Sequence, residues 1–502
     1  NSHVNISEQD RETLIKAVNI FKGEDAGFFD QAIYDSSALT LFKGCFEKFN
    51  GFFNQEIERA LRENKHAPWF VNEYVDLLLQ NQPDVVGFSV MFPEQLSFSF
   101  LVARMLKTAN RAIKIVFGGS LATTLYKNVL THASTRPFVD FVVLNEGEKA
   151  FLALLEAIAG DREPGDVPDL AFNNNGVVTA TESSMITDLD EIPIPDFSDF
   201  DCHAYFNPAP VLPVLGSRGC YWRRCTFCVH HKSYFNKYRV ASIRHVVDEL
   251  EFHVKNGIKY FDLVDEMIPS GRFRQIAEEI IRRELELYYY ALAKPTADFT
   301  TDVFELMYRS GCRYILWGVE SGCQRTLDLM DKGTNIDDIP RVLADSASAG
   351  IKNHIFVITG FPSETKEESR ETQAFLYENR SSIHAIHNGF FALFKGSLIY
   401  QHPERFCITK LYDPDFADGL VRYDVSRGMN YDELRQQGGF YPKNYFPYFH
   451  YFSAGLVGLR DHALILYSNH DKLVFNLEKK DIPLPNKKPK SATSALTMSP
   501  QS

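Results

Sequence analysis

The sequence has no apolar run that approaches the roughly 18 residues needed to cross a lipid bilayer. Its polar first residues, Asn1 to Asn5, also lack the apolar stretch of a secretory signal peptide. We therefore expect a cytoplasmic protein that has no membrane as a partner.

The chain also has no excess of positive charge and little cysteine. It carries 53 Lys and Arg against 65 Asp and Glu, a net charge of −12, which argues against the basic surface that nucleic-acid binding needs. Eight cysteines in 502 residues are too few for a disulfide framework, which favours a reducing compartment. A hydrophobic content of 45% is enough for the cores of two or three domains.

Three of the cysteines lie close together, at Cys220, Cys225 and Cys228. They follow the apolar run Val211 to Leu215, which predicts a buried strand, so they belong to a loop at the carboxyl end of that strand. Three thiolates can hold three irons of a four-iron cluster and leave the fourth open to a ligand. The spacing therefore indicates a working iron–sulfur cluster.

Two other metal sites stay open for this loop. Cys225 and Cys228 could form half of a zinc knuckle, completed by Cys220 and by His230 or His231. A ferredoxin-like electron carrier usually has four cysteine ligands, and the loop has no nearby fourth cysteine. Cys312 and Cys323 flank a predicted strand, and we expect them to be core thiols.

The loop resembles the cluster loop of the radical S-adenosylmethionine (SAM) superfamily. The resemblance rests on the spacing C-x4-C-x2-C and on Phe227 before the last cysteine, although the commonest form has three residues between the first two cysteines. The segment Ser217 to Cys228 is similar to a branch with an N-terminal cobalamin-binding domain, which includes C-methyltransferases and maturases of ribosomal peptides. Phe227 is then an expected SAM contact.

Residues 85–159 predict an open α/β sheet. Apolar strands are expected at 85–92, 113–117 and 138–144, with helices at 96–107 and 150–159. In the resembled branch this domain holds cobalamin at the carboxyl edge of its strands. The resemblance implies contacts from residues that follow the three strands: Ser89, Gly118, Gly119, Ser120, Glu146 and Gly147.

Two features of the N-terminal region bear on the cobalamin prediction. The motif D-x-H-x-x-G is absent from residues 1–200, and the sequence that starts like it at Asp201 has Phe206 in place of glycine. We therefore expect no histidine ligand to cobalt from this motif. Residues 1–75 show no apolar opening strand, so the domain is expected to miss its first strand, or to be a scaffold without a cofactor.

After the cysteine loop, strands and helices alternate. Strands are expected at 260–264, 288–292, 314–319, 354–359 and 388–394, with helices between them that end at Gly257, Gly311 and Gly350. This period predicts a parallel sheet curled into a barrel of about six units, instead of the eight of a TIM barrel.

The fold class is therefore α/β: a Rossmann-like domain of cobalamin-binding type, a partial (β/α)6 TIM-type barrel and a small C-terminal extension. We expect the first domain at 1–160, a proline-containing linker at 161–210 and the barrel at 211–400. The extension spans 401–478, with an aromatic stretch at 441–452, and a disordered tail follows at 479–502.

Polar residues follow successive barrel strands, where the resemblance implies a SAM site. Asp265 and Glu266 follow the second strand, and either one could contact the SAM ammonium. Lys294 after the third strand could pair with the SAM carboxylate, and Glu320 after the fourth could accept the ribose hydroxyls. Two further candidates follow the fourth and fifth strands: Ser321 and Gly360.

The resemblance implies a radical SAM enzyme with a 4Fe–4S cluster, SAM and cobalamin. Such an enzyme cleaves SAM reductively to a 5′-deoxyadenosyl radical and C-methylates an unactivated carbon, here in a peptide natural product. The implied partners are a small-molecule or peptide substrate and an electron donor such as flavodoxin or ferredoxin.

Other functions stay open. One is a radical SAM maturase that does not methylate, namely a cyclase, an epimerase or a crosslinking enzyme. Another is a zinc-stabilised binding protein without turnover. A methylthiotransferase is disfavoured, because residues 1–200 carry only Cys45 and no second set of three cysteines.

Overall fold

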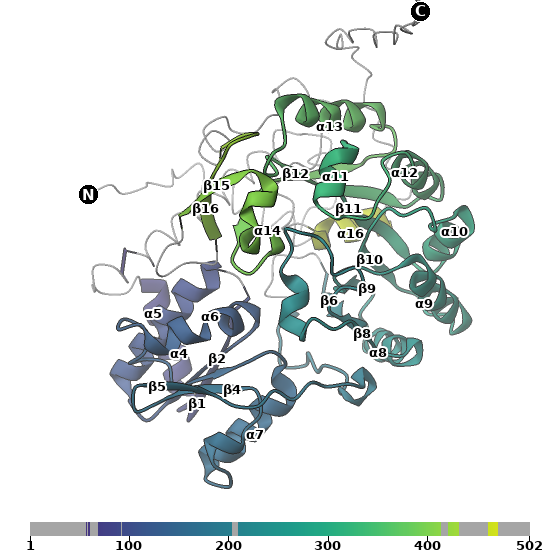
Figure 1. Ribbon diagram of the computed structural model, residues 1–502. Helices are drawn as coiled ribbons and strands as arrows, with labels where there is room; N and C mark the ends of the chain where they lie inside the picture. Colours follow the sequence, from purple (N-terminus) through teal and green to yellow (C-terminus); the bar gives the residue numbers. More distant parts are fainter. Residues whose placement is uncertain are drawn as a thin grey trace, which may run out of the picture.

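The computed structural model describes residues 57, 59–60, 69–91, 93–202, 209–412, 420–430 and 460–469. Within them lie an N-terminal five-stranded sheet and a larger six-stranded sheet, which occupy separate parts of the molecule (Figure 1). The predicted features at residues 1–56, the aromatic stretch at 441–452 and the tail at 479–502 lie outside the described residues. No helix in the described ranges is long and apolar enough to span a membrane.

The first sheet has the order β1-β2-β3-β4-β5. Its strands β1 (Val85–Ser89), β2 (Lys114–Gly118) and β3 (Phe141–Val143) are parallel, as the open-sheet prediction requires. The helices of this region are α4 (Trp69–Gln80), α5 (Pro93–Ala109), α6 (Ser120–Thr131) and α7 (Gly147–Ala159). The α/β class and the Rossmann-like arrangement are confirmed.

The prediction of a linker over 161–210 is wrong for part of that range. β4 (Leu170–Asn174) and β5 (Val177–Ala180) form an antiparallel hairpin, and β4 pairs antiparallel with β3. The hairpin extends the first sheet at its β3 edge. Surrounding prolines and short strands gave it little sequence periodicity, yet Leu170 and Ala171 are fully buried.

The second sheet is parallel throughout and has the order β13-β12-β11-β10-β9-β6. Its strands are β6 (Val211–Val214), β9 (Tyr260–Leu263), β10 (Tyr288–Ala293), β11 (Cys312–Glu320), β12 (Lys352–Thr359) and β13 (Ala385–Phe390). The prediction of about six barrel units is confirmed. The helices of this region are α8 (Ile243–Lys255), α9 (Ser270–Arg282), α10 (Thr301–Arg309), α11 (Gln324–Leu329), α12 (Ile339–Ser348) and α13 (Lys366–Glu378).

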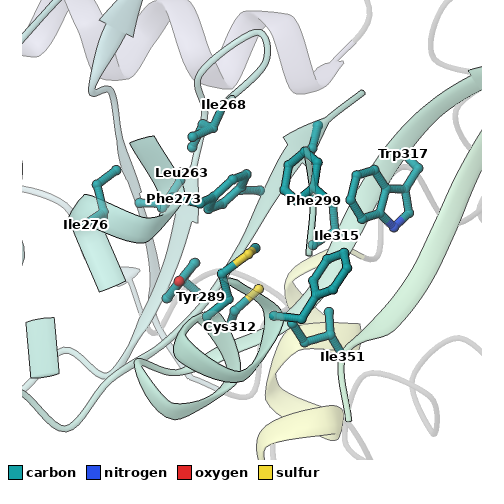
Figure 2. Packing of buried hydrophobic residues seen from close by; sticks show 14 of the residues in the cluster. Leu263, Ile268, Phe273, Ile276, Tyr289, Phe299, Cys312, Ile315, Trp317 and Ile351 are labelled. Carbon is teal, nitrogen blue, oxygen red and sulfur yellow. The ribbon is translucent and has the colours of Figure 1, made fainter. Parts of the chain in front are cut away.

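Aliphatic and aromatic side chains together fill the layer between this sheet and its outer helices (Figure 2). Phe299 lies between Phe273 and Trp317, with ring centroids 6.0 Å and 5.1 Å away. The indole nitrogen of Trp317 donates to Asn353 Oδ1 at 2.8 Å, so its buried polar atom is satisfied. This packed layer fixes the strand ends that carry the candidate site.

The C-terminal part adds a small sheet and a helix to the barrel. The sheet has the order β14-β16-β15, built from β14 (Leu393–Phe394), β15 (Ile408–Tyr412) and β16 (Leu420–Val425), with α14 (Leu398–Gln401) beside it. The helix α16 (Arg460–Asn469), yellow in Figure 1, packs against β9, β10 and β11.

Candidate functional site

The three cysteines lie in a loop that a small two-stranded sheet closes. β7 (Ser217–Arg218) pairs antiparallel with β8 (Arg239–Val240), and residues 219–238 between them form the cysteine loop. This loop also contains a 3-10 turn at His230–Tyr234. A short ladder at its base makes the loop a bounded unit at the carboxyl end of β6.

The cysteine loop is anchored on the segment that follows α11. Thr226 donates from its backbone N to Met330 O at 2.9 Å and from its hydroxyl to Leu329 O at 3.0 Å. The indole of Trp222 donates to Asp331 O at 2.6 Å. These contacts join loop positions to residues about a hundred positions later, which holds the cysteines over the barrel.

One cavity contains all three cysteines. Cys220, Cys225 and Cys228 line it, together with Phe227, Glu266 and Glu320. Leu292, Leu316 and Phe356, from β10, β11 and β12, supply apolar lining. The loop and the strand ends therefore meet at one site, as the sequence predicts.

Burial disfavours ionisation of two of the cysteine thiols. Burial raises the pKa of Cys225 and raises the pKa of Cys228 to about 12, so on their own both groups stay protonated. Iron binds the thiolate form, and its positive charge offsets this cost of ionisation.

Among the described residues no three His, Cys, Asp or Glu side chains converge on a point where a single metal ion would bind. A cluster differs, because each thiolate binds its own iron.

Glu266 is the strand-end carboxylate that faces the cavity after β9. It lines the cavity and lies 3.2 Å from Nδ1 of His230, in the cysteine loop. The prediction left Asp265 and Glu266 as alternatives. Only Glu266 lies at the cavity.

Asp265, the other predicted candidate for a SAM contact, has a structural position. It is 3% exposed and accepts a hydrogen bond from Gly216 N at 3.0 Å and another from the Ser217 hydroxyl. Burial raises the pKa of Asp265 by more than these hydrogen bonds lower it. Its carboxyl group joins the end of β9 to the start of β7 and does not line the cavity.

Lys294 is also placed away from the cavity lining, against the prediction. Its Nζ lies 3.4 Å from the ring centroid of Trp222 and donates to Lys332 O at 3.2 Å. Burial, with repulsion from Lys332, lowers the pKa of Lys294 to about 8. The side chain therefore supports Trp222 of the cysteine loop by a cation–π contact.

Glu320 lies at the cavity and is paired there with a residue that sequence reasoning missed. Lys332 Nζ contacts Glu320 Oε1 at 2.8 Å, and both side chains are nearly buried. Burial alone would lower the pKa of Lys332, but attraction to Glu320 outweighs it and raises the pKa. Lys332 follows α11 and not a strand, so the strand-end pattern could not identify it. Glu320 also has a φ of +66°, rare for a non-glycine residue and typical of functional sites.

Ser321 and Gly360 do not line the cavity either. Ser321 Oγ accepts from Cys323 N at 3.1 Å and lies 3.2 Å from Thr372 Oγ1, so its hydroxyl is used inside the fold. Gly360 has a φ of +77° and donates its N–H to Glu364 Oε2 at 2.7 Å. Both residues shape the backbone after their strands.

The carboxyl edge of the first sheet carries several small residues beside the exposed Met91. Ser89 is exposed at the end of β1, and Gly118, Ser120 and Gly147 are partly exposed after β2 and β3. Gly119 has a φ of +93°, and a Cβ there would lie 2.6 Å from Val90 O, so only glycine fits. A flat ring can approach such an edge closely, so these residues fit cobalamin.

Glu146, also predicted as a cobalamin contact, departs from this pattern because its carboxylate is paired inside the protein. Its side chain is 1% exposed and is paired with Arg218 at 2.9 Å and Arg239 at 2.6 Å. It faces the barrel domain and not the open edge. His203 and Phe206 of the incomplete cobalamin motif lie outside the described residues.

Two family models match the chain in the regions just described. The B12 binding domain matches residues 56–155, and the radical SAM superfamily matches residues 214–376. The chain combines a B12-binding domain with a radical SAM domain. The match of the radical SAM model to the region of the cysteine loop favours an iron–sulfur cluster over the zinc alternative.

Individual relatives cover parts of this radical SAM chain. An uncharacterized methyltransferase, PH0819, of Pyrococcus horikoshii is 27% identical, over 61% of this chain and 66% of that protein. The anaerobic magnesium-protoporphyrin IX monomethyl ester cyclase of Rubrivivax gelatinosus is 30% identical, over 58% of this chain and 53% of the cyclase. The chain thus spans about half to two thirds of the length of these relatives.

A solved structure extends the likeness to most of the chain. The radical SAM methyltransferase TsrM from Kitasatospora setae, with tryptophan substrate and a SAM analog bound, superposes with a TM-score of 0.59. The sequences are 18% identical, and the match covers 84% of this chain and 85% of TsrM. At this identity the likeness shows a shared fold.

Proposed function

We propose that this protein is a radical SAM enzyme that methylates an unactivated carbon with the help of cobalamin. The observation that carries the proposal is the cavity at which Cys220, Cys225 and Cys228 meet the strand-end carboxylates, in a chain that also has a B12-binding domain. When bound, the 4Fe–4S cluster supplies the electron that cleaves SAM to methionine and a 5′-deoxyadenosyl radical, and cobalamin supplies the transferred methyl group.

The chain's own residues bind and orient SAM in this proposal. The three cysteines hold three irons, and Glu266 accepts hydrogen bonds from the SAM ammonium. Glu320 accepts from the ribose hydroxyls, and Lys332, whose Nζ lies 2.8 Å from Glu320 Oε1, holds this carboxylate in place. Phe227 and the apolar side chains of Leu292, Leu316 and Phe356 exclude water from the site.

The proposed cobalamin contacts are the open residues of the first sheet's carboxyl edge. Ser89, Gly118, Gly119, Ser120 and Gly147 leave the backbone accessible to the corrin. No residue of the D-x-H-x-x-G motif is assigned to cobalt, because the sequence does not complete that motif.

We propose a small-molecule or peptide substrate and a soluble electron donor such as flavodoxin or ferredoxin. The support for a peptide is the resemblance of Ser217 to Cys228 to the loops of peptide maturases. We propose a cytoplasmic location and no membrane partner. The net charge of −12 supports the proposal that nucleic acid is not a partner either.

A second candidate function is a radical SAM reaction without methylation, such as a cyclisation. The specific observation that favours it is the relative from Rubrivivax gelatinosus, a cyclase that is 30% identical over 58% of this chain. In that function the same cavity binds SAM, and the substrate radical closes a ring.

Anaerobic reconstitution with iron and sulfide tests the proposal and separates the two functions. We expect about four irons per chain, bound cobalamin, and both S-adenosylhomocysteine and 5′-deoxyadenosine on reduction with SAM. Formation of 5′-deoxyadenosine alone would support the second function. Zinc in place of iron, or no SAM cleavage by a fully loaded protein, would contradict both.

Cysteine variants test whether the cysteine loop holds the cluster, with a cysteine outside the loop as the control. Replacing Cys220, Cys225 and Cys228 by Ala should abolish the cluster, because no other described cysteine lies at the cavity. Cys407→Ala should keep the full iron content, since Cys407 lies outside the cysteine loop. Equal loss of iron in both variants would mean that the loop is not the cluster site.

A further inference from the structure

The first domain and the cysteine loop meet at a buried carboxylate. Glu146 follows β3 and immediately precedes α7. Its Oε1 accepts from Arg218 at 2.9 Å and from Arg239 at 2.6 Å, and its Oε2 accepts from Arg239 at 3.0 Å and from Ile186 N at 3.1 Å. Both carboxylate oxygens are therefore used within the protein.

The two arginines stand at the base of the cysteine loop. Arg218 of β7 and Arg239 of β8 are register partners in the short ladder that closes the loop. Arg218 precedes Cys220 by only two positions. A shift of either arginine therefore moves the backbone that carries the first cysteine.

The junction depends on the negative charge of Glu146. Burial acts to raise the pKa of Glu146, but the hydrogen bonds from Arg239 and Arg218 outweigh it and hold the pKa below its usual value. Glu146 thus stays ionised, and removal of its charge leaves two arginines without their shared partner. Arg218 would keep only the more exposed Glu148 and Arg239 only the Ile186 carbonyl, and an incompletely paired buried charge is unfavourable, so the loop base is expected to move until water reaches the arginines.

Neighbouring ion pairs are more exposed. Glu148 also contacts Arg218, with 41% of its side chain exposed. Lys149 pairs with Glu191 at 2.9 Å, and both side chains are more than half exposed, so this pair is screened by solvent. Within the described residues, Glu146 is the nearly buried acid of this junction.

We infer that Glu146, with Arg218 and Arg239, is a positioning residue that fixes the cysteine loop relative to the carboxyl edge of the first sheet. Its task is to hold the cluster cysteines at a set place beside the corrin edge, without touching the corrin. The inference rests on the proposed function for its cluster and cobalamin readouts, but the junction itself can be tested in the apo protein.

The experiment compares Glu146→Gln with wild type in three measurements. In the apo protein, hydrogen exchange of residues 217–240 should rise at least tenfold. In the reconstituted protein, loss of iron to an added chelator should accelerate by a similar factor. The dissociation constant for hydroxocobalamin, from an absorbance titration, should change less than threefold.

Three further variants keep the test decisive. Lys149→Gln, the matched control in the helix that Glu146 precedes, should leave all three measurements unchanged. Arg218→Lys keeps the charge but loses the bidentate fork, and Glu148→Gln removes an exposed contact, so both should give smaller changes of the same kind. If Glu146→Gln does not fold, these two variants carry the comparison.

Two results would overturn the inference. A large loss of cobalamin affinity with unchanged iron release would make Glu146 a corrin contact. A lowered melting temperature with unchanged exchange of residues 217–240 and unchanged iron release would make it a general stabilising residue. If wild type holds no cluster, the proposed function fails, while the exchange measurement on apo protein still decides the role of Glu146.

Discussion

Two adjacent acids that follow β9 have different surroundings. Asp265 accepts from the Gly216 backbone and the Ser217 hydroxyl, whereas Glu266 lines the cavity. The sequence places both carboxylates after a strand, but the chain there is no longer a strand, so no side-chain alternation says which way each one points. The local path of the chain thus separates a structural acid from a proposed ligand-binding acid.

Substitution of the two acids should separate stability from SAM binding. Asp265→Ala leaves the buried Gly216 N–H and Ser217 hydroxyl without their acceptor, and should lower the free energy of unfolding by about 3 kcal/mol. Glu266→Gln removes a charge at the cavity, and should weaken SAM binding about tenfold with little change in stability. Chemical denaturation of the apo proteins and equilibrium dialysis of SAM with the reconstituted proteins measure the two effects.

The opposite pattern would contradict these roles. An Asp265→Ala protein of normal stability that cannot bind SAM would restore Asp265 as the ligand. Normal SAM affinity in Glu266→Gln would remove Glu266 from the proposed site.

At the scale of elements, Gly257 and Gly311 each follow the end of a barrel helix. The two glycines have different surroundings. Gly257 after α8 has a φ of +88° and open space where a Cβ would be. Gly311 after α10 has a φ of +106°, and a Cβ there would lie 2.0 Å from Leu287 O. Both positions need a left-handed backbone, but only Gly311 is also pressed against a neighbouring backbone.

Alanine at these two positions should therefore have unequal effects on stability. Gly257→Ala should cost about 1 kcal/mol, the usual penalty of a left-handed alanine. Gly311→Ala should cost about 3 kcal/mol or more, because the chain before β10 or the start of β11 must also shift. Thermal unfolding of both variants beside wild type measures the difference, and equal shifts would show that the backbone at Leu287 relaxes freely.

Elements were predictable where the sequence alone carries their pattern. The barrel strands are continuous apolar runs followed by helices with an apolar face, and each was found within a few residues of its observed bounds. The β4–β5 hairpin was missed because prolines surround it. Contacts between distant segments were also missed: Lys332 with Glu320 and Glu146 with Arg218 depend on how the chain folds back, which no local pattern records.

At the scale of the whole molecule, α16 joins the end of the described chain to the barrel. Leu464 and Tyr467 are buried in one cluster with Tyr290, Tyr314 and Leu316 from β10 and β11. The hydroxyl of Tyr314 donates to Arg460 O at 3.0 Å, and Tyr290 donates to Asp461 Oδ1 at 3.2 Å. Because Leu316 also lines the cavity, this helix supports the wall of the candidate site.

Loss of packing at α16 should therefore be felt in the barrel strands. Leu464 is 0% exposed, so Leu464→Ala removes buried contacts and leaves a cavity, at a cost of about 2–5 kcal/mol. We expect faster hydrogen exchange in β10 and β11 and a lower melting temperature. Leu152→Ala, at a leucine of α7 that is 61% exposed, is the control and should change neither. If Leu464→Ala matches this control, α16 does not support the barrel, and the cavity wall is held by the strands and outer helices alone.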